Sequence, residues 1–166
     1  MTADAALVDR ELKQRMVESI PRLRAFALSL CGNSDRADDL VQECLTKALL
    51  NLRSFTSGTN LSAWLFTILR NTYYSEFRRH RREVPDSDGI HYATLVSQPT
   101  QDDHMNFLDF NKAMQQLPPD QREALILVGA AGFSYEEAAE ICNCAIGTVK
   151  SRVSRARSQL ATLLGV

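Results

Sequence analysis

FSYEEAAEICNCAIGTVKSRVSRARSQL, residues 133–160, has the pattern of two short helices separated by a tight turn. Ser134 and Glu137 form a capping box, in which each side chain accepts a hydrogen bond from the other residue's backbone N–H. A helix is therefore predicted to begin there. Ala138 and Ala139 are small enough for another helix to cross closely, and the polar stretch Asn143–Ala145 suits a short turn before a second helix.

The second of these helices has two different faces, read at about 100° per residue. The face expected to turn inward carries Ile146, Val149, Val153, Ala156 and Leu160. The opposite face carries Gly147, Ser151, Ser154 and Ser158, flanked by Lys150 and Arg157 on one edge and by Thr148 and Arg155 on the other. Small residues let a helix backbone approach base edges, and long cations at the rim reach phosphates or guanine acceptors. The pattern indicates DNA binding; the alternative is a solvated basic face.

Charge and composition limit the possible partners. The chain has 166 residues, a formal net charge of −1 and a pI of about 6.3. No global positive field attracts nucleic acid, so attraction to phosphate must come from local patches. Residues 84–104 stand apart, because they contain acidic residues and neither Lys nor Arg. No apolar run is long enough to cross a bilayer, and the N-terminus is too polar for a secretory signal, so we expect a cytoplasmic protein without a membrane segment.

The cysteines and histidines do not have the spacing of a metal site or a catalytic centre. Cys31, Cys44, Cys142 and Cys144 are expected to be reduced and mostly buried, with a redox or metal pair at Cys142 and Cys144 as the alternative. No nucleophile–base constellation or phosphate-binding glycine loop is recognisable. We therefore expect no catalytic residues, no metal, no cofactor and no enzymatic activity.

Helical periodicity runs through nearly the whole chain, which predicts an all-α fold of two helical domains. The predicted domains cover residues 1–83 and 106–166, and a flexible linker covers residues 84–105. The apolar linker residues Ile90, Tyr92, Leu95 and Val96 leave open whether part of the linker docks on a partner. The predicted helices cover Ala6–Ile20, 22–31, Asp35–Leu52, Leu61–Arg82, Phe107–Leu117, and a segment from Pro119 towards Gly132. In the first of them Leu7, Leu12, Met16 and Ile20 are expected to face inward.

Two surfaces of the N-terminal domain have the composition of possible binding sites. The outer face of the helix Asp35–Leu52 mixes acidic residues with an exposed leucine, which suits either a basic protein partner or simple solvation. The helix Leu61–Arg82 interleaves aromatic, amide and cationic residues on its accessible faces, and it ends in a basic cluster at residues 78–82. This composition is typical of a platform for unpaired bases, although its aromatic residues could equally be packing residues.

Several separated stretches together resemble the extracytoplasmic-function (group IV) sigma factors of bacterial RNA polymerase. They are DDLVQECLTKAL (38–49), RSFTSGTNLSAWLFTILRNTYY (53–74), the basic helix end, the linker, and LPPDQREALILVGAAGFSYEEAAEICNCAIGTVKSRVSRAR (117–157). The resemblance covers nearly the whole chain. GFSYEEAAEIC (132–142) with GTVKSRVSRAR (147–157) is most similar to the general stress response subgroup.

The resemblance implies three functional surfaces. The helix beginning near Asp39 would dock on the clamp helices of the polymerase's largest subunit, through Asp39, Gln42, Glu43, Lys47 and Leu50. The loop ahead of Trp64 would capture a base flipped from the −10 element, and the implied −10 set is Phe55, Gly58, Asn60, Trp64, Thr67, Arg70, Asn71, Tyr74 and Arg78. The second helix of the helix-turn-helix would read the −35 element, with Lys150, Ser151, Ser154 and Arg155 facing bases and Thr148, Arg152 and Arg157 nearer phosphate.

Two positions depart from the family pattern. Val128 stands where some members place a DNA-contacting arginine. Arg152 lies near the apolar edge of its helix, so it is open whether it contacts DNA or pairs with Glu136 or Glu137.

The sequence thus predicts a sigma factor for stress-response genes, a monomer when free, whose partners are the core polymerase, promoter DNA and an anti-sigma factor. It also predicts that the acidic linker passes through a channel of the polymerase. Two other classes of protein fit the sequence less well. A decoy that only sequesters an anti-sigma factor should have lost the cationic helix, and an operator-binding repressor would normally need a dimerising or ligand-sensing domain.

Overall fold

The computed structural model describes residues 3–83 and 103–166 and contains helices but no strand within those ranges. The all-α prediction is therefore confirmed. The chain divides into two compact units, Met1–Ala93 and Thr94–Val166, called unit 1 and unit 2 below. The apolar residues expected in the linker, Ile90, Tyr92, Leu95 and Val96, lie outside the described residues.

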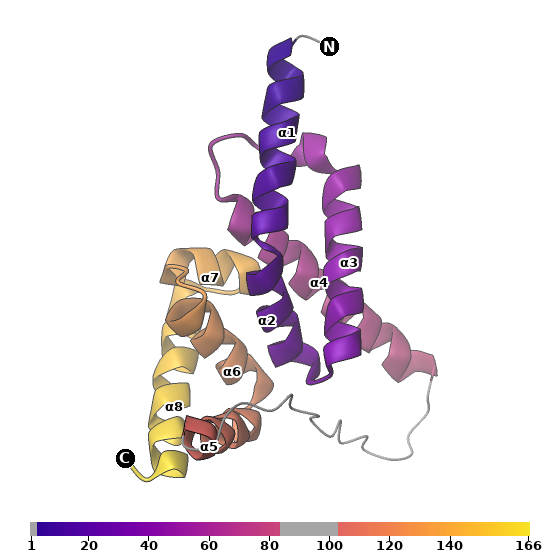
Figure 1. Cartoon of the computed structure of the whole chain (residues 1–166). Coiled ribbons are helices and arrows are strands. Elements are labelled where there is room, and N and C mark those ends of the chain that lie inside the picture. The colour runs from indigo at the N-terminus through magenta and orange to yellow at the C-terminus, as the bar shows by residue number, and fades with distance from the viewer. Residues whose placement is uncertain (1–2, 84–102) are drawn as a thin grey trace. The chain divides into compact units, whose positions relative to one another are not determined.

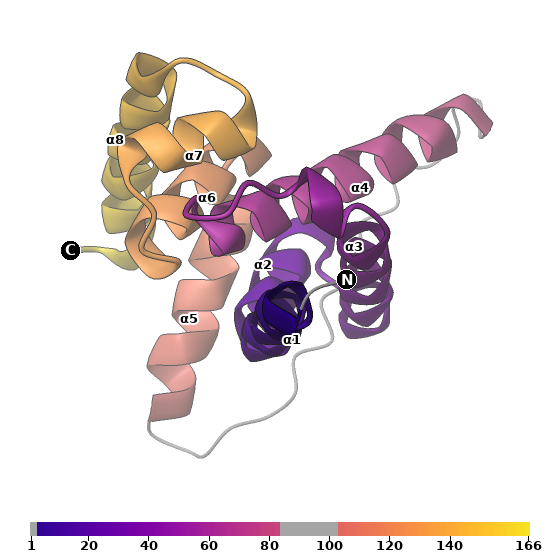
Figure 2. The ribbon, with the colours of Figure 1, turned by 90° about the horizontal axis from the view of Figure 1, so that it is seen from above.

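The described part of unit 1, residues 3–83, contains four α-helices and one short 3-10 turn. They are α1 (Ala3–Glu18), α2 (Ile20–Cys31), α3 (Ser34–Leu50), the turn η1 (Leu52–Ser54) and α4 (Leu61–Glu83). Helices α2, α3 and α4 pack on one another, while α1 and α2 run nearly end to end (Figures 1 and 2). The predicted stop of the second helix at Gly32 is confirmed: Gly32 has a φ of 68° and donates its N–H to the carbonyl of Leu28 at 2.8 Å.

The core of unit 1 lies where α2, α3 and α4 meet. Phe26 of α2 stacks on Phe66 of α4 with 4.9 Å between ring centroids. The buried apolar residues of these three helices are Leu23, Phe26, Ala27 and Cys31 from α2; Ala37, Leu40, Val41, Cys44 and Ala48 from α3; and Leu61, Leu65, Phe66 and Leu69 from α4.

The prediction for the first helix is partly wrong. Met16 is buried, but Leu7 is 61% exposed. The reason is that α1 rises past the end of α3, so its first turns have no helix beside them (Figure 1). A helical wheel identifies an apolar face but does not say how far along the helix a neighbour extends.

Unit 2 is built around the helix-turn-helix. Its elements are α5 (Asp103–Gln116), α6 (Pro119–Leu125), the π-helical turn η2 (Ile126–Ala130), α7 (Tyr135–Cys142) and α8 (Ile146–Leu164). The expected helix after Pro119 therefore changes to a wider π turn before it ends, and Gly132 follows with a φ of 77°. Helices α5, α6 and α7 all pack against α8.

The capping box and the turn are confirmed. The Ser134 hydroxyl accepts from the N–H of Glu137 at 3.1 Å, and the Glu137 carboxylate accepts from the N–H of Ser134 at 2.9 Å. After α7, Asn143 adopts a left-handed conformation with a φ of 51°, which the short polar side chain of Asn tolerates. This reversal sends the chain into α8.

The predicted inward face of α8 is confirmed except at one position. Val149, Val153 and Ala156 are fully buried, and Met114, Leu117 and Ala156 form a cluster against which Leu125, Ile126 and Leu160 pack. Ile146 was expected to face inward but is 39% exposed. It is the first residue of the helix, where no preceding turn covers it.

Candidate nucleic-acid interface

The outer face of α8 is open and cationic. Arg155 and Arg157 are exposed, and neither has an ion-pair partner among residues 3–83 and 103–166. Ser154 and Ser158 are exposed between them, while Thr148 and Ser151 are half-buried at the edges. Because small side chains separate the long cations, a polyanion could approach the helix backbone here.

The beginning of α8 is also accessible. Gly147 is exposed, and a Cβ at that position would meet nothing within 4 Å. Ala145 precedes the helix and offers no side-chain acceptor to the first backbone N–H groups. Such uncapped N–H groups and the helix dipole favour a negatively charged group at this end.

Two cations of α8 have internal partners. Lys150 is exposed, and its Nζ lies 5.7 Å from the centre of the Tyr135 ring. Arg152 is half-buried, and its Nε lies 3.3 Å from Oδ2 of Asp120 on α6. The carboxylate that pairs with Arg152 thus belongs to Asp120 and not to Glu136 or Glu137, the two residues considered from the sequence.

In unit 1, the loop ahead of α4 is held by its own contacts. The Phe55 ring is only 8% exposed and packs against Trp64 with 5.2 Å between ring centroids. Gly58 is exposed with a φ of 87°, a conformation that L side chains rarely adopt. Asn60 accepts from the N–H of Ala63 at 3.1 Å and so caps α4. Gly58 is open to solvent, whereas Phe55 supports the loop from inside.

The middle of α4 carries a stacked set of aromatic and cationic groups. The Arg70 guanidinium lies 4.5 Å from the centre of the Tyr74 ring, and Tyr74 meets Tyr73 edge to face at 5.1 Å. Asn71 is exposed beside them, and Arg78 is exposed further along with a contact of 3.5 Å to Ser75. Thr67 donates its hydroxyl to the carbonyl of Ala63 at 2.8 Å, so its polar group is already engaged.

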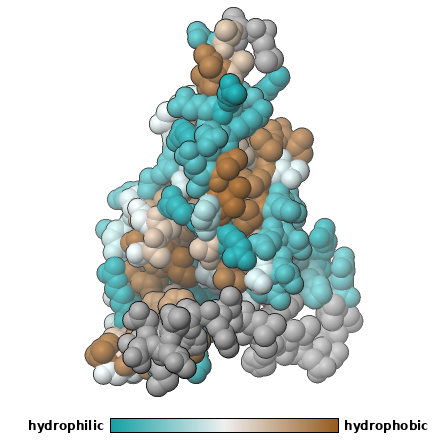
Figure 3. Space-filling model, in the orientation of Figure 1, coloured by the Kyte–Doolittle hydropathy of each residue, from teal (hydrophilic) through white to brown (hydrophobic). Residues whose placement is uncertain are grey.

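The outer face of α3 combines exposed side chains with engaged ones. Asp39 and Gln42 are exposed, and Leu50 is 81% exposed at the end of the helix. Figure 3 shows hydrophobic surface at this end of α3. An exposed leucine of this size next to polar residues is a feature of protein-binding surfaces.

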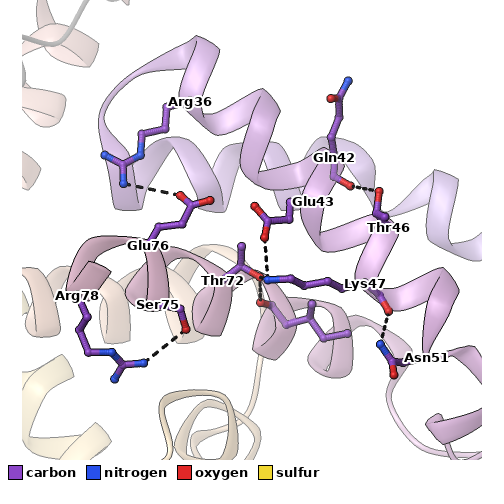
Figure 4. A network of polar contacts seen from close by, with 11 residues as sticks. Arg36, Gln42, Glu43, Thr46, Lys47, Asn51, Thr72, Ser75, Glu76 and Arg78 are labelled. Atoms are coloured by element: carbon purple, nitrogen blue, oxygen red, sulfur yellow. Dashed lines mark hydrogen bonds and ion pairs between the residues drawn. The ribbon is translucent and has the colours of Figure 1, made fainter. Parts of the chain in front are cut away.

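Glu43 and Lys47 belong to a polar network between α3 and α4, shown in Figure 4. Lys47 lies 2.8 Å from the Glu43 carboxylate and donates to the hydroxyl of buried Thr72 at 3.1 Å. Glu76 of α4 lies 3.8 Å from Arg36 of α3, and Glu43 is near enough to raise its pKa. Both predicted partner-binding residues, Glu43 and Lys47, therefore already have partners within unit 1.

The pKa values of the two carboxyl groups in this network are shifted in opposite directions. The hydrogen bond from Lys47 lowers the pKa of Glu43. Burial, and then the neighbouring Glu43, raise the pKa of Glu76. A proton on Glu76 relieves the cost of burying its charge and removes the repulsion between the two carboxylates.

Three residues of these surfaces were not found from the sequence. Tyr73 lies 5.6 Å from the Arg36 guanidinium and stacks on Phe77. Glu76 faces Glu43, and Asp120 holds Arg152. Each connects two different helices, so no spacing within one helix would have indicated its partner.

The cysteines have the environment of packing residues. Cys31, Cys44 and Cys142 are buried, and Cys144 is half-buried. Burial raises the pKa of Cys44 to about 12, which makes this thiol a poor nucleophile at neutral pH. In the described part of the chain no group of three His, Cys, Asp or Glu residues could hold a metal ion. Nor does that part contain a helix long and apolar enough to cross a membrane.

Comparison with known families finds two matches that together cover most of the chain. The family "Sigma-70 region 2" matches residues 16–83, and "Sigma-70, region 4" matches residues 107–160. The ECF RNA polymerase sigma factor EcfG of Rhodopseudomonas palustris is 61% identical over 155 residues, which are 93% of this chain and 86% of that protein.

Two solved structures are similar over nearly the full length. The sigma factor RpoE of Bartonella quintana, in complex with the anti-sigma factor NepR, has 54% identity and a TM-score of 0.85, covering 95% of this chain and 98% of that one. CnrH, in complex with the cytosolic domain of CnrY, has 25% identity and a TM-score of 0.69, covering 94% of this chain and 88% of that one.

The opposite pKa shifts of Glu43 and Glu76 predict opposite effects of two isosteric substitutions. A carboxyl group with a raised pKa contributes stability below its ordinary value of 4.5 and loses that contribution as the pH rises through the raised value. Glu76→Gln should therefore raise the free energy of unfolding near neutral pH, and the gain should vanish below pH 4.5. Glu43→Gln should lower it near neutral pH, because a lowered pKa stabilises the ionised form. Urea denaturation at pH values from below 4.5 to neutral measures the free energy of unfolding of both variants.

The control for this pair is Glu11→Gln, which removes an exposed carboxylate of α1 and should change the free energy of unfolding little. Effects of the same sign for Glu43→Gln and Glu76→Gln would contradict the opposite pKa shifts of the two carboxyl groups.

Proposed function

The chain belongs to the extracytoplasmic-function sigma factors of bacterial RNA polymerase, and we propose that its two units divide promoter recognition between them. Unit 2 binds the −35 element as duplex, and unit 1 binds the core polymerase and the separated −10 strand. The observation that carries this assignment is the outer face of α8, where the unpaired cations Arg155 and Arg157 flank small residues on a helix whose other face packs into the core through Val149, Val153 and Ala156. In domain terms, residues 1–83 are region 2, residues 84–105 the linker and residues 106–166 region 4.

In the proposed −35 complex, α8 lies in the major groove. Arg155, Ser154, Ser151 and Lys150 face base edges, and Thr148 and Arg157 lie nearer phosphate. Support comes from the charge and the accessibility of this face and of the first turn at Gly147. An arginine that contacts a guanine with two hydrogen bonds discriminates against the other bases, whereas a phosphate contact does not.

In the proposed −10 complex, the loop Phe55–Asn60 and α4 hold unpaired bases. The Arg70, Tyr73 and Tyr74 set supplies aromatic and guanidinium planes, with Asn71 and Arg78 exposed beside it. Stacking on such planes is worth about 1–3 kcal/mol per base. These groups bind a base only after it has left the duplex, so binding itself favours the open promoter. No covalent chemistry is required of this chain.

In the proposed docking on core polymerase, α3 is the contact helix. Leu50 supplies apolar area, and Asp39 and Gln42 supply polar contacts. Glu43 and Lys47 remain part of the proposed interface, although both are bonded within unit 1 and would exchange or share those bonds on docking. We place this complex in the cytoplasm, where the polymerase works.

The proposed regulation of this chain involves the same surfaces as its proposed activity. Because a relative with 54% identity was solved with the anti-sigma factor NepR, we propose that an anti-sigma factor also restrains this chain by covering its polymerase-binding and DNA-binding surfaces. The likeness to EcfG and the residues 132–142 and 147–157 support a role in the general stress response.

The direct test is transcription in vitro with core polymerase from a related bacterium. Template DNA should be a pool of genomic fragments, so that no promoter sequence is assumed. The full chain should produce discrete transcripts that core enzyme alone does not make, and addition of an anti-sigma factor from the same organism should abolish them. Absence of chain-dependent transcripts with a core enzyme that binds the chain would count against the proposal.

Arg155→Ala should weaken binding of the holoenzyme to its selected promoters by about 1–3 kcal/mol, roughly 5- to 150-fold, if Arg155 reads a base. Affinity for core polymerase should not change. Fluorescence anisotropy with a selected and a scrambled duplex measures the effect, and Ser158→Ala on the same face is the matched control. An equal loss on both duplexes would reassign Arg155 to a phosphate contact.

Leu50→Ser should weaken core binding by about 1–3 kcal/mol, because it removes an apolar side chain that is buried only in the complex. The fold should persist, since Leu50 is 81% exposed in the chain alone. Leu7→Ser, which removes an exposed leucine of α1, is the control. Titration of labelled chain with core polymerase gives both dissociation constants, and an unchanged value for Leu50→Ser would exclude the end of α3 from the interface.

A further inference from the structure

Arg152 connects three parts of unit 2 through one side chain: helix α8, helix α6 and the turn between α7 and α8. It begins on α8, its Nε lies 3.3 Å from Oδ2 of Asp120 on α6, and its Nη1 lies 3.9 Å from Sγ of Cys144 in the turn between α7 and α8. The side chain is 25% exposed. A guanidinium with fixed donor directions suits such a bridge better than a flexible ammonium would.

Asp120 is itself held in place. It lies in the first turn of α6, after Pro118 and Pro119, where the helix dipole favours a carboxylate. Its Oδ1 accepts from the N–H of Gln121 at 2.9 Å, which leaves Oδ2 for Arg152. The carboxylate therefore has a defined direction although its side chain is 53% exposed.

The position of Arg152 on α8 explains why it reaches α6. Val149 and Ala156, three residues before and four after it, are both fully buried. Residues with that spacing lie on the same side of a helix. Arg155 is displaced in the opposite direction around the helix, away from Val149 and Ala156, and is exposed. Among the cations of α8, Arg152 is thus the one directed along the packed face.

We propose that Asp120 is a positioning residue for DNA recognition, which acts through Arg152 to fix the rotation of α8 and so the direction of Lys150, Ser154 and Arg155. Arg152 serves this bridge and does not contact phosphate. The inference rests on the proposed binding of the −35 element by α8. A partly exposed ion pair adds little to global stability, so its effect is on orientation.

The proposal makes a prediction opposite in sign to simple electrostatics. Asp120→Asn removes a negative charge near a DNA-binding helix, which by charge alone should tighten binding. We expect it to weaken binding to a selected duplex about two- to tenfold, because Arg152 loses its anchor. Asp120→Glu should restore much of the affinity. The matched control, Asp109→Asn, removes an exposed carboxylate of α5 and should not weaken binding.

The experiment is anisotropy titration of reconstituted holoenzyme on a duplex that wild-type holoenzyme selects from a random pool, at several salt concentrations. If Asp120 acts through Arg152, the double variant Asp120→Asn/Arg152→Gln should bind no more weakly than Arg152→Gln alone. For Arg152→Gln, the slope of log affinity against log salt concentration should equal that of wild type. Loss of a phosphate contact would instead reduce the magnitude of this slope by about one. Partial unfolding would weaken binding to the selected and the scrambled duplex alike, whereas lost positioning should weaken binding to the selected duplex.

Two results would overturn the inference: binding by Asp120→Asn as tight as wild type, or additive losses with a reduced salt slope for Arg152→Gln. Arg155→Ala and a scrambled duplex, run in parallel, separate this inference from the proposed function. If wild type prefers the selected duplex and Arg155→Ala loses that preference, an unaffected Asp120→Asn removes only the role of Asp120. If wild type shows no preference, −35 recognition by α8 fails as well.

Discussion

Burial of one face of α8 is the constraint on which unit 2 depends. Val149, Val153 and Ala156 are removed from solvent, and α5, α6 and α7 all pack against this helix. Because a helix has only one such face, its remaining surface is free to carry small residues and cations that contribute nothing to the core. The same packing determines how α8 is rotated, and therefore which cations point outward.

Local pairing, rather than net charge, determines which charged groups can meet a partner. The chain as a whole is slightly acidic. Arg155 and Arg157 are nevertheless exposed and lack ion-pair partners in the described part of the chain, whereas Arg152 is held by Asp120. On α3, Asp39 and Leu50 are exposed, whereas Glu43 and Lys47 are bonded to each other and to α4. An engaged side chain must give up or share its bonds before it binds a partner, and this costs free energy. An unpaired side chain has no such bonds to lose.

Unit 1 shows the same distinction for aromatic groups. Phe26 and Phe66 stack inside the core, and Phe55 packs under its loop against Trp64. Tyr73 and Tyr74 lie half-buried on α4, in contact with arginines. Aromatic groups packed against the core side of α4 stabilise it, and those along its surface make it suited to unpaired bases.

Sequence alone was sufficient for the features that depend on neighbours within about one helical turn. These include the capping box at Ser134, the stop at Gly32, the turn at Asn143, the buried stripe of α8 and the all-α class, and the order of the motifs indicated the family. Tertiary structure decided which helices lie beside one another. It left Leu7 exposed where α1 has no neighbour, gave Arg152 its partner in Asp120, and brought Glu43 to Glu76. The physical reason is that periodicity is a property of a single helix, whereas a side chain's partner, burial and pKa depend on the helix packed against it.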